Sequence, residues 1–158
     1  MKQHLQRIYL DTSVFGGYYE TEFELYSKML FQKIIKGEII LLYSQITEIE
    51  LSRAPNNVQK LIQQIPEDYI EFLSITDEAR ELAKQYIAEK VVGKTSNSDC
   101  LHIAIATISN ADILASWNFK HIVNINRIRG YNGINIKNGF RMLEIRTPRE
   151  IITYEKEK

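Results

Sequence analysis

The sequence predicts an α/β protein of three layers, in which helices cover both faces of a central parallel sheet. Short apolar runs typical of strands alternate with segments of helical periodicity along most of the chain, and this alternation favours parallel strands that are joined by helices. Residues 39–43 (IILLY) are continuously apolar, as expected for a strand that is buried on both faces.

Apolar residues recur at helical spacing in five segments, and several of these have a residue that can start or stop a helix. Gly37 can end the first helix, Ser44 can cap the second and Asp77 can cap the fourth. The fifth helix is apolar around most of its circumference, which predicts that it is buried. The predicted helices cover residues 22–36, 45–53, 57–64, 77–89 and 97–109.

Strands are predicted where short apolar runs lie between turn residues. They cover residues 8–10, 39–43, 69–75, 113–115, 134–136 and 144–145. The sequence has no glycine- or serine-rich linker and no internal repeat. We therefore expect residues 1–158 to form a single domain, with about eight flexible residues at the C-terminus.

The composition is that of a soluble globular protein. Hydrophobic residues make up 44% of the 158 residues and charged residues 25%, which is ordinary for such a domain. Cys100 is the one cysteine, which excludes an intrachain disulfide and fits a reducing compartment. The sequence has no apolar run near the ~20 residues of a membrane span and no signal-peptide pattern at its start. We expect a cytoplasmic protein without membrane attachment.

The charges are unevenly distributed although the formal net charge is zero. Residues 1–112 contain 11 Lys and Arg against 16 Asp and Glu, whereas residues 113–149 contain seven against one. A metal-dependent nuclease needs acids that hold the ion and bases that hold phosphates. The distribution fits that need, and a chance imbalance on a solvated surface is the alternative.

Acidic residues follow two of the predicted strands or begin the helix that comes next. Asp11 ends the first strand, and Asp99 lies in the first turn of the apolar helix. Glu48 and Glu50 lie on one helix but two positions apart, so they face opposite ways and the spacing does not choose between them. Ligands bind at the carboxyl ends of parallel strands. Asp112 precedes its strand and is therefore interpreted as structural.

Each of these acids also has a purely structural interpretation. Asp11 can form an Asx turn or a helix cap, and Asp99 is favoured in a first helical turn by the helix macrodipole. However, a carboxylate at the start of a buried helix needs a cation or hydrogen bonds. Asp99 is therefore the stronger candidate for a metal ligand.

Four segments, taken in order, resemble the PIN domain family: IYLDTSVFGG, SQITEIEL, SDCLHIAIA and ADILASWNFKH. The resemblance spans nearly the whole chain. In that family an Asp follows the first strand, which corresponds to Asp11, and an acid opens the apolar helix, which corresponds to Asp99. A Glu lies six residues past a Ser, and counting from Ser44 selects Glu50 over Glu48.

The chain departs from the family at the fourth acid, which usually lies in a Thr-x-Asp motif. Here the motif is Ser116-Trp117-Asn118, and the Ser-Trp-Asn-Phe-Lys-His form resembles that of a PIN subgroup. The amide is a neutral ligand, so the resemblance implies that Asn118 positions water, a second metal or substrate. Thr12 and Ser13 resemble positions that orient the metal, its water or a phosphate, and Ser116 is grouped with them as a substrate residue.

The resemblance implies a metal-dependent endoribonuclease that hydrolyses RNA phosphodiesters with Mg²⁺ or Mn²⁺. Asp11, Glu50 and Asp99 would be the metal ligands. Many small PIN proteins resemble VapC-type toxins, which implies an antitoxin partner and a homodimer, whereas others serve in RNA processing. The alternative function, motivated by Asn118, is a PIN-like module that binds RNA or a protein without catalysis.

Basic and aromatic residues in the C-terminal third could contact RNA. Phosphate contacts are expected from Lys120, Arg127 and Arg129, with Lys137 and Arg141 as further candidates. Trp117, Phe119 and Tyr131 could stack on unpaired bases, although core packing is the alternative and is favoured for Phe119. His102 is expected to be a hydrogen-bonded core residue, and His121 a loop residue.

Three other enzyme classes lack their motifs in this sequence. A haloacid-dehalogenase-type phosphatase needs a second Asp two residues after Asp11, where the chain has Ser13. A Rossmann domain needs a glycine-rich first turn, which DTSVFGG does not supply. A serine hydrolase of the α/β type needs a G-x-S-x-G segment, which is absent.

Overall fold

The computed structural model describes residues 4–93 and 96–156. Its centre is a five-stranded sheet with the order β3-β2-β1-β4-β5, and every pair of neighbouring strands is parallel. The predicted α/β class with a central parallel sheet is therefore confirmed. The strands are β1 (Gln6–Leu10), β2 (Ile39–Ser44), β3 (Ile70–Leu73), β4 (Ile113–Ala115) and β5 (Glu144–Arg146).

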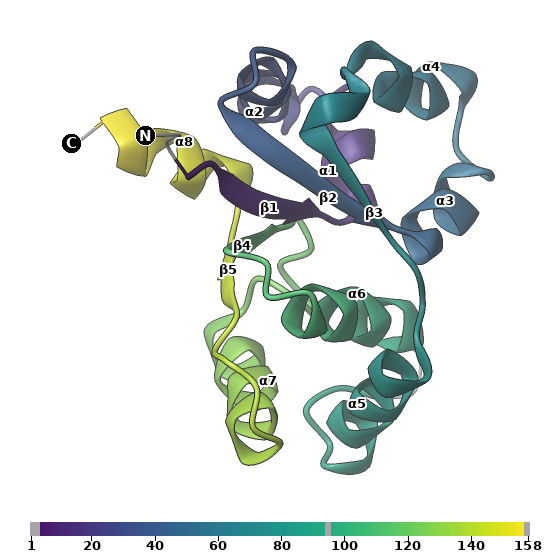
Figure 1. The fold of residues 1–158 in the computed structure, drawn as a ribbon, viewed down its shortest axis with the longest axis vertical. Helices are drawn as coiled ribbons and strands as arrows, with labels where there is room; N and C mark the ends of the chain where they lie inside the picture. The colour runs from purple at the N-terminus through teal and green to yellow at the C-terminus, as the bar shows by residue number, and fades with distance from the viewer. Residues whose placement is uncertain (1–3, 94–95, 157–158) are drawn as a thin grey trace.

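Helices cover both faces of this sheet (Figure 1). One layer contains α1 (Thr12–Gly17), α2 (Glu24–Ile35) and α8 (Pro148–Lys156), and the other contains α5 (Asp77–Ala88), α6 (Asn97–Ile108) and α7 (Ile125–Lys137). The remaining helices are short: α3 (Gln45–Leu51), α4 (Asn56–Gln59), η1 (Lys60–Gln64) and η2 (Glu67–Tyr69).

Alternation along the central strand produces a separate core on each face of the sheet. On β1, Ile8 and Leu10 belong to the core beneath α1, α2 and α8, whereas Tyr9 belongs to the core beneath α5, α6 and α7. This alternation follows from the two-residue period of a strand. The three predicted layers are thus present.

Residues 125–137 form a helix, so the strand predicted at residues 134–136 is wrong. Asn124 caps this helix by accepting hydrogen bonds from the backbone N–H groups of Asn126 and Arg127. Tyr131 and Ile134 then lie three residues apart on its buried face, a spacing that suits a helix. The alternation of Ile134, Asn135 and Ile136 imitates the two-residue period of a strand and concealed the helical periodicity.

The C-terminal segment also differs from the expectation. Residues 148–156 form α8, and Ile151 and Ile152 are buried in the core beneath α2, so the expected flexible tail is wrong as far as Lys156. Thr147 and Glu150 cap this helix reciprocally. The last two residues of that expected tail, 157–158, lie outside the described residues.

Two helix starts are also corrected. Residues 12–17, where no helix is predicted from the sequence, form α1. The cap of α5 is Thr76, whose hydroxyl accepts from the backbone N–H of Ala79, instead of Asp77. By contrast, Ser44 caps α3 as predicted and forms a capping box with Thr47.

The strand order determines where a ligand can bind. The chain runs outward from β1 through β2 to β3, and then returns beside β1 as β4. The carboxyl ends of β1 and β4 therefore form a topological switch point, which is the usual ligand position in an open parallel sheet.

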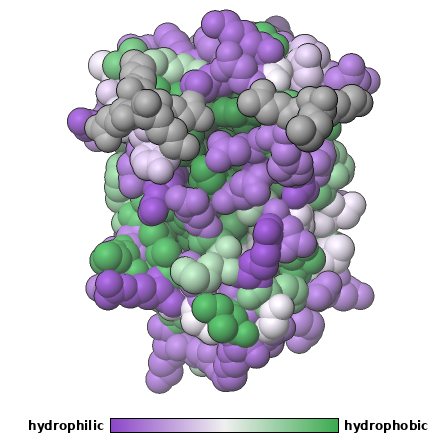
Figure 2. Space-filling view, turned by 60° about the vertical axis from the view of Figure 1, so that its left-hand side comes forward, coloured by the Kyte–Doolittle hydropathy of each residue, from purple (hydrophilic) through white to green (hydrophobic). Residues whose placement is uncertain are grey.

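The surface is mixed in character. On the face seen in Figure 2, hydrophobic patches lie between hydrophilic residues. Over the described residues as a whole, the exposed large hydrophobics include Ile136 of α7 and Met142 before β5. Within residues 4–93 and 96–156, no helix has the length and hydropathy that crossing a membrane requires.

The buried position of α8 predicts a clear stability effect. Replacing Ile152, which is 1% exposed, by alanine should lower the free energy of unfolding by about 2–4 kcal/mol because it leaves a cavity. Thr153→Ala, on the neighbouring and more exposed position, should change it by less than about 0.5 kcal/mol. Urea unfolding of the two variants measures the difference. Equal effects would mean that α8 does not pack as described.

Candidate active site

Asp11 is a buried carboxylate at the switch point. It follows β1 directly and occupies the N-cap position of α1, and its backbone N–H donates to the carbonyl of Ala115 at 3.2 Å. Only 3% of the residue is exposed. Both oxygens accept hydrogen bonds at 2.6 Å, Oδ1 from the hydroxyl of Ser13 and Oδ2 from the hydroxyl of Ser116.

The same two serines hold the loop that leaves β4. The backbone N–H of Trp117 donates to Ser13 Oγ, and that of Asn118 donates to Ser116 Oγ, each at 2.9 Å. The Trp117 ring lies against Gly17, where a Cβ atom would come within 2.9 Å of the indole. The start of α1 and the exit of β4 therefore form one hydrogen-bonded unit around Asp11.

Glu50 is brought to this unit from α3. Its Oε1 accepts a hydrogen bond from Thr12 Oγ1 at 2.8 Å and lies 2.5 Å from His102 Nε2. Glu48, two positions earlier on the same helix, is exposed. The structure thus places Glu50, and not Glu48, beside the start of α1.

A buried chain of hydrogen bonds supports Glu50 from behind. His102 Nδ1 lies 2.6 Å from Tyr9 Oη, which in turn lies 2.7 Å from Ser44 Oγ. Burial strongly raises the pKa of the Tyr9 phenol, so Tyr9 stays neutral and keeps its proton to donate. The chain links the cap of α3 to the carboxylate that the same helix carries.

His102 is buried and hydrogen-bonded, as predicted for a core histidine, but its contact with Glu50 was not foreseen. A signal for it exists in the sequence. His102 lies three residues after Asp99, and residues three apart on a helix share a face. A histidine on the same face as a candidate metal ligand can reach the other members of the site.

Asp99 lies in the first turn of α6 and is partly buried. Burial raises the pKa of its carboxyl, and the charges of Asp11 and Glu50 raise it further, whereas His102 and His121 act in the opposite direction. These five side chains therefore share one electrostatic environment. His121, expected only as a loop residue, is part of it.

Asp11 and Glu50 differ in how their charge is balanced. Burial raises the pKa of Asp11, and this outweighs the opposing effects of His102, Ser116 and Ser13. Burial acts the same way on Glu50, but its hydrogen bond to His102 and the nearby Thr12 and Arg53 lower its pKa overall. Glu50 is thus the one carboxylate of the three whose pKa lies below its ordinary value.

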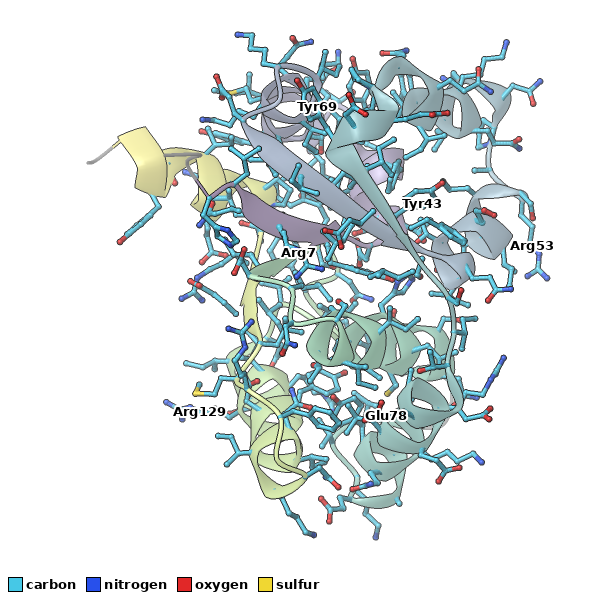
Figure 3. All side chains as sticks on the ribbon, in the orientation of Figure 1. Arg7, Tyr43, Arg53, Tyr69, Glu78 and Arg129 are labelled. Atoms are coloured by element: carbon cyan, nitrogen blue, oxygen red, sulfur yellow. The ribbon has the colours of Figure 1, made fainter. Side chains whose placement is uncertain are left out.

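Arg53 was not singled out from the sequence. It follows α3 and is exposed, and Figure 3 shows it beside the C-terminal end of that helix. It is the one arginine among the groups that shift the pKa of Glu50, so it is a basic group on this side of the molecule.

The predicted substrate residues are only partly brought together. Asn118 uses its amide oxygen to accept from the backbone N–H of His121 at 3.0 Å, so it holds the turn. Lys120 is exposed and lies two residues after Asn118. Arg127 lowers the pKa of Tyr131, whereas Asp99 raises it. Arg129 lies on α7 on the opposite side of the view from Arg53 (Figure 3), away from the site.

The aromatic residues divide against expectation. Trp117 and Tyr131 are buried, whereas Phe119, which was assigned to the core, is exposed. Its neighbours Trp117 and Phe23 already fill the space beneath it, so the third ring of the group remains at the surface.

The structural interpretation of Asp112 is supported, because its Oδ2 accepts from the backbone N–H of Arg7 at 2.8 Å, at the other end of the sheet.

The donor chemistry of the site suits a hard divalent cation, since Mg²⁺ and Mn²⁺ favour oxygen ligands. Among the described residues, however, no group of three or more His, Cys, Asp and Glu is already arranged to hold an ion. Both oxygens of Asp11 and Oε1 of Glu50 accept hydrogen bonds, so a bound ion would share these oxygens with their present partners or displace them. Two carboxyls with raised pKa values remain, and a cation would offset that cost.

The PIN domain family model matches residues 8–120. The chain belongs to the PIN domain family. The match covers the segments that carry Asp11, Glu50, Asp99 and Asn118, so the resemblance of those segments is confirmed at the level of the family.

Solved structures share the fold of this PIN domain. A chain of the VapBC2 structure from Rickettsia felis, bound to a DNA fragment from their promoter, has 15% identity and a TM-score of 0.54, and covers 90% of this chain and 98% of its own. DNA-bound VapBC from Salmonella typhimurium has 18% identity and a TM-score of 0.52, covering 92% and 99%. FitAcB from Neisseria gonorrhoeae has 14% identity and a TM-score of 0.57, covering 90% and 98%. No curated protein matches the sequence.

Because the pKa of Asp99 is raised, the ionised form of this carboxyl lowers the free energy of unfolding of the PIN domain. The folded protein binds this proton more tightly than the unfolded chain does, so stability falls as the pH rises from the unfolded to the folded pKa and stays lower above it. Asp99→Asn should therefore raise the unfolding temperature near pH 7 in a chelator, and the gain should shrink towards pH ~4.

Calorimetric melts over this pH range measure the effect, and Glu48→Gln is the control because Glu48 is exposed. That control should shift the unfolding temperature little at any pH. A lower unfolding temperature for Asp99→Asn near pH 7 would show that the carboxylate is better compensated than its surroundings indicate.

Proposed function

We propose that this PIN domain is a metal-dependent endoribonuclease that acts as the toxin of a toxin–antitoxin pair. The observation that carries the proposal is the convergence of Asp11, Glu50 and Asp99 from three different elements into one electrostatic environment. Family membership supports a nuclease, and PIN nucleases generally use divalent ions.

The proposed ligands of the ion are Asp11, Glu50 and Asp99, with Mg²⁺ or Mn²⁺ as the cation. When bound, such an ion lowers the pKa of a water molecule to yield hydroxide and offsets charge on the attacked phosphate. Glu50 uses Oε1 for both Thr12 and His102, so we assign Oε2 to the ion. Asn118 contributes no charge, and its amide holds the turn after β4.

The hydroxyl groups near the site orient carboxylates. Ser13 and Ser116 donate to Asp11, and Thr12 donates to Glu50. We therefore assign them to ligand positioning and leave direct substrate contact to Lys120 and Arg127. His102 has the same positioning role towards Glu50.

RNA is the proposed substrate, and a small antitoxin protein is the proposed partner. Chains of the VapBC and FitAcB structures share this fold, which supports a partner protein. Expression of this chain alone should then arrest growth, and co-expression of the gene beside its own should relieve the arrest. A homodimer and a cytoplasmic location are further expectations of this proposal.

The second candidate function is a PIN-like module that binds RNA or protein without cleaving it. Two observations favour it: Asn118 stands where the family usually has an acid, and no ready-made metal group exists among the described residues. It predicts RNA binding with no cleavage in Mg²⁺ or Mn²⁺, and no effect of Asp99→Asn on that binding.

Cleavage of labelled RNA in Mn²⁺ and in chelator tests the nuclease. Glu50→Gln should lower kcat/KM by on the order of 100-fold or more, because it removes a charged ligand. Glu48→Gln, on the opposite face of the same helix, should cut within about twofold of the wild type. The reverse ranking would overturn the assignment of Glu50, and cleavage that persists in chelator would overturn the metal mechanism.

The hydrogen-bond chain behind Glu50 generates a separate prediction. Tyr9→Phe leaves the buried His102 Nδ1 without its partner and removes one of the partners of Ser44 Oγ, and should cost roughly 1–3 kcal/mol of stability. It should also weaken Mn²⁺ binding roughly 10-fold or more, as loss of supporting hydrogen bonds does in metal sites.

The matched control is Tyr86→Phe, which removes the buried hydrogen bond to Asn135 in the same core. It should lower stability similarly and leave Mn²⁺ affinity unchanged. Calorimetric titration with Mn²⁺ and urea unfolding give the two readouts. If both variants bind Mn²⁺ equally well, the chain does not position Glu50.

A further inference from the structure

An aromatic ring stands at the surface directly after the site motif. Phe119 follows Asn118 on the loop that leaves β4 and is 52% exposed. Its ring lies 6.3 Å, centroid to centroid, from both Trp117 and Phe23, and these two stack on each other at 4.6 Å. Phe119 is therefore the open end of a three-ring group.

The two inner rings are fixed in place. The indole Nε1 of Trp117 donates to Ser27 Oγ of α2 at 2.8 Å, and Trp117 is buried. Phe23 leads into the same helix. The exposed ring thus rests on a rigid support, so binding a planar group against it would cost little side-chain entropy.

The loop keeps Phe119 within a short length of chain from Asp11. Ser116 donates to Asp11, and the backbone N–H of Trp117 donates to Ser13. Phe119 lies three positions after Ser116, which is at most about 11 Å of extended chain. A strand of RNA whose phosphate lies at Asp11 would bring the next one or two bases to Phe119.

We infer that Phe119 is a stacking platform for an unpaired nucleobase beside the scissile phosphate. This inference rests on the proposed ribonuclease function and deepens it, because it names a side chain that positions the substrate. A base in a duplex is stacked on its neighbours, so the platform selects single-stranded or looped RNA. The exposed Lys120, next in the chain, supplies positive charge for the adjoining phosphate.

Stacking on an aromatic ring differs from simple apolar burial in a way that can be measured. It depends on the flat π face and tolerates any base. Phe119→Leu keeps an apolar side chain and removes that face, whereas Phe119→Tyr keeps it. A surface for an apolar protein segment would accept leucine, and a base would not.

The first measurement locates the cut, and determines its rate, in one single-stranded RNA 20-mer of arbitrary sequence in Mn²⁺. Phe119→Ala and Phe119→Leu should each lower kcat/KM roughly 5- to 100-fold, the range for loss of one base–aromatic stack. Phe119→Tyr should remain near the wild type. The matched control is Phe72→Ala on β3, an equally exposed phenylalanine at 47% that lies three strand positions from β4, and it should cut normally.

The second measurement removes the base instead of the ring. An abasic nucleotide is placed at each position flanking the mapped cut in turn. At one position the wild type should lose as much rate as Phe119→Ala loses on intact RNA, and Phe119→Ala should lose little more there. Additive losses at every position would overturn the inference, because ring and base would then act independently.

The remaining outcomes separate this inference from the proposed function. If the wild type cuts RNA and Phe119→Leu cuts equally well, the platform is refuted and the nuclease stands. If Phe119→Leu changes only co-purification with the antitoxin, the ring belongs to a protein interface. If the wild type binds Mn²⁺ but cuts no RNA, both proposals fall.

Discussion

The two hydrogen bonds that the Asp11 carboxylate accepts organise the end of the sheet on which the site depends. Ser13 supplies one from the first turn of α1, and Ser116 supplies the other from the exit of β4. Because both serines also accept backbone N–H groups of the β4 loop, one buried carboxylate joins two segments more than a hundred residues apart in sequence. The positions of Asn118 and Phe119 follow from that junction. So does the need for Gly17, whose missing side chain leaves room for the Trp117 ring.

The three carboxylates of the site differ in how the protein balances their charge. Glu50 is compensated by the protein itself, since His102, Thr12 and Arg53 outweigh the effect of burial and lower its pKa. For Asp11 and Asp99 the compensating groups do not outweigh burial, and the pKa of each carboxyl is raised. Carboxyl groups whose pKa is raised by burial and by neighbouring charges are typical of functional sites. The site therefore combines one carboxylate that the fold has oriented with two whose repulsion an ion would relieve.

Sequence patterns predicted the parts of the fold that depend on local periodicity. The buried strand at 39–43, the Ser44 cap and the apolar helix that Asp99 opens were confirmed, because each is encoded within a few residues. The helix over 125–137 was missed because two of its buried positions, Asn132 and Asn135, are polar. Asn132 exchanges two hydrogen bonds with the backbone of Leu143, and Asn135 donates to Thr107. Partners that lie distant in sequence make such residues suitable for a core, and a single sequence does not show them.

The same limit applied to the site. Family spacing selected Glu50, which lies beside the start of α1 whereas Glu48 is exposed. The contact of Glu50 with His102 and the exposure of Phe119 arise from packing between elements. The most direct test of the central claim is anomalous diffraction from crystals soaked in Mn²⁺. We expect one manganese peak bound by Asp11, Glu50 and Asp99, with the hydrogen bonds from Ser13 or Ser116 to Asp11 rearranged. A crystal in which manganese lies elsewhere, while these carboxylates keep only their hydroxyl and histidine partners, would contradict a metal centre at this end of the sheet.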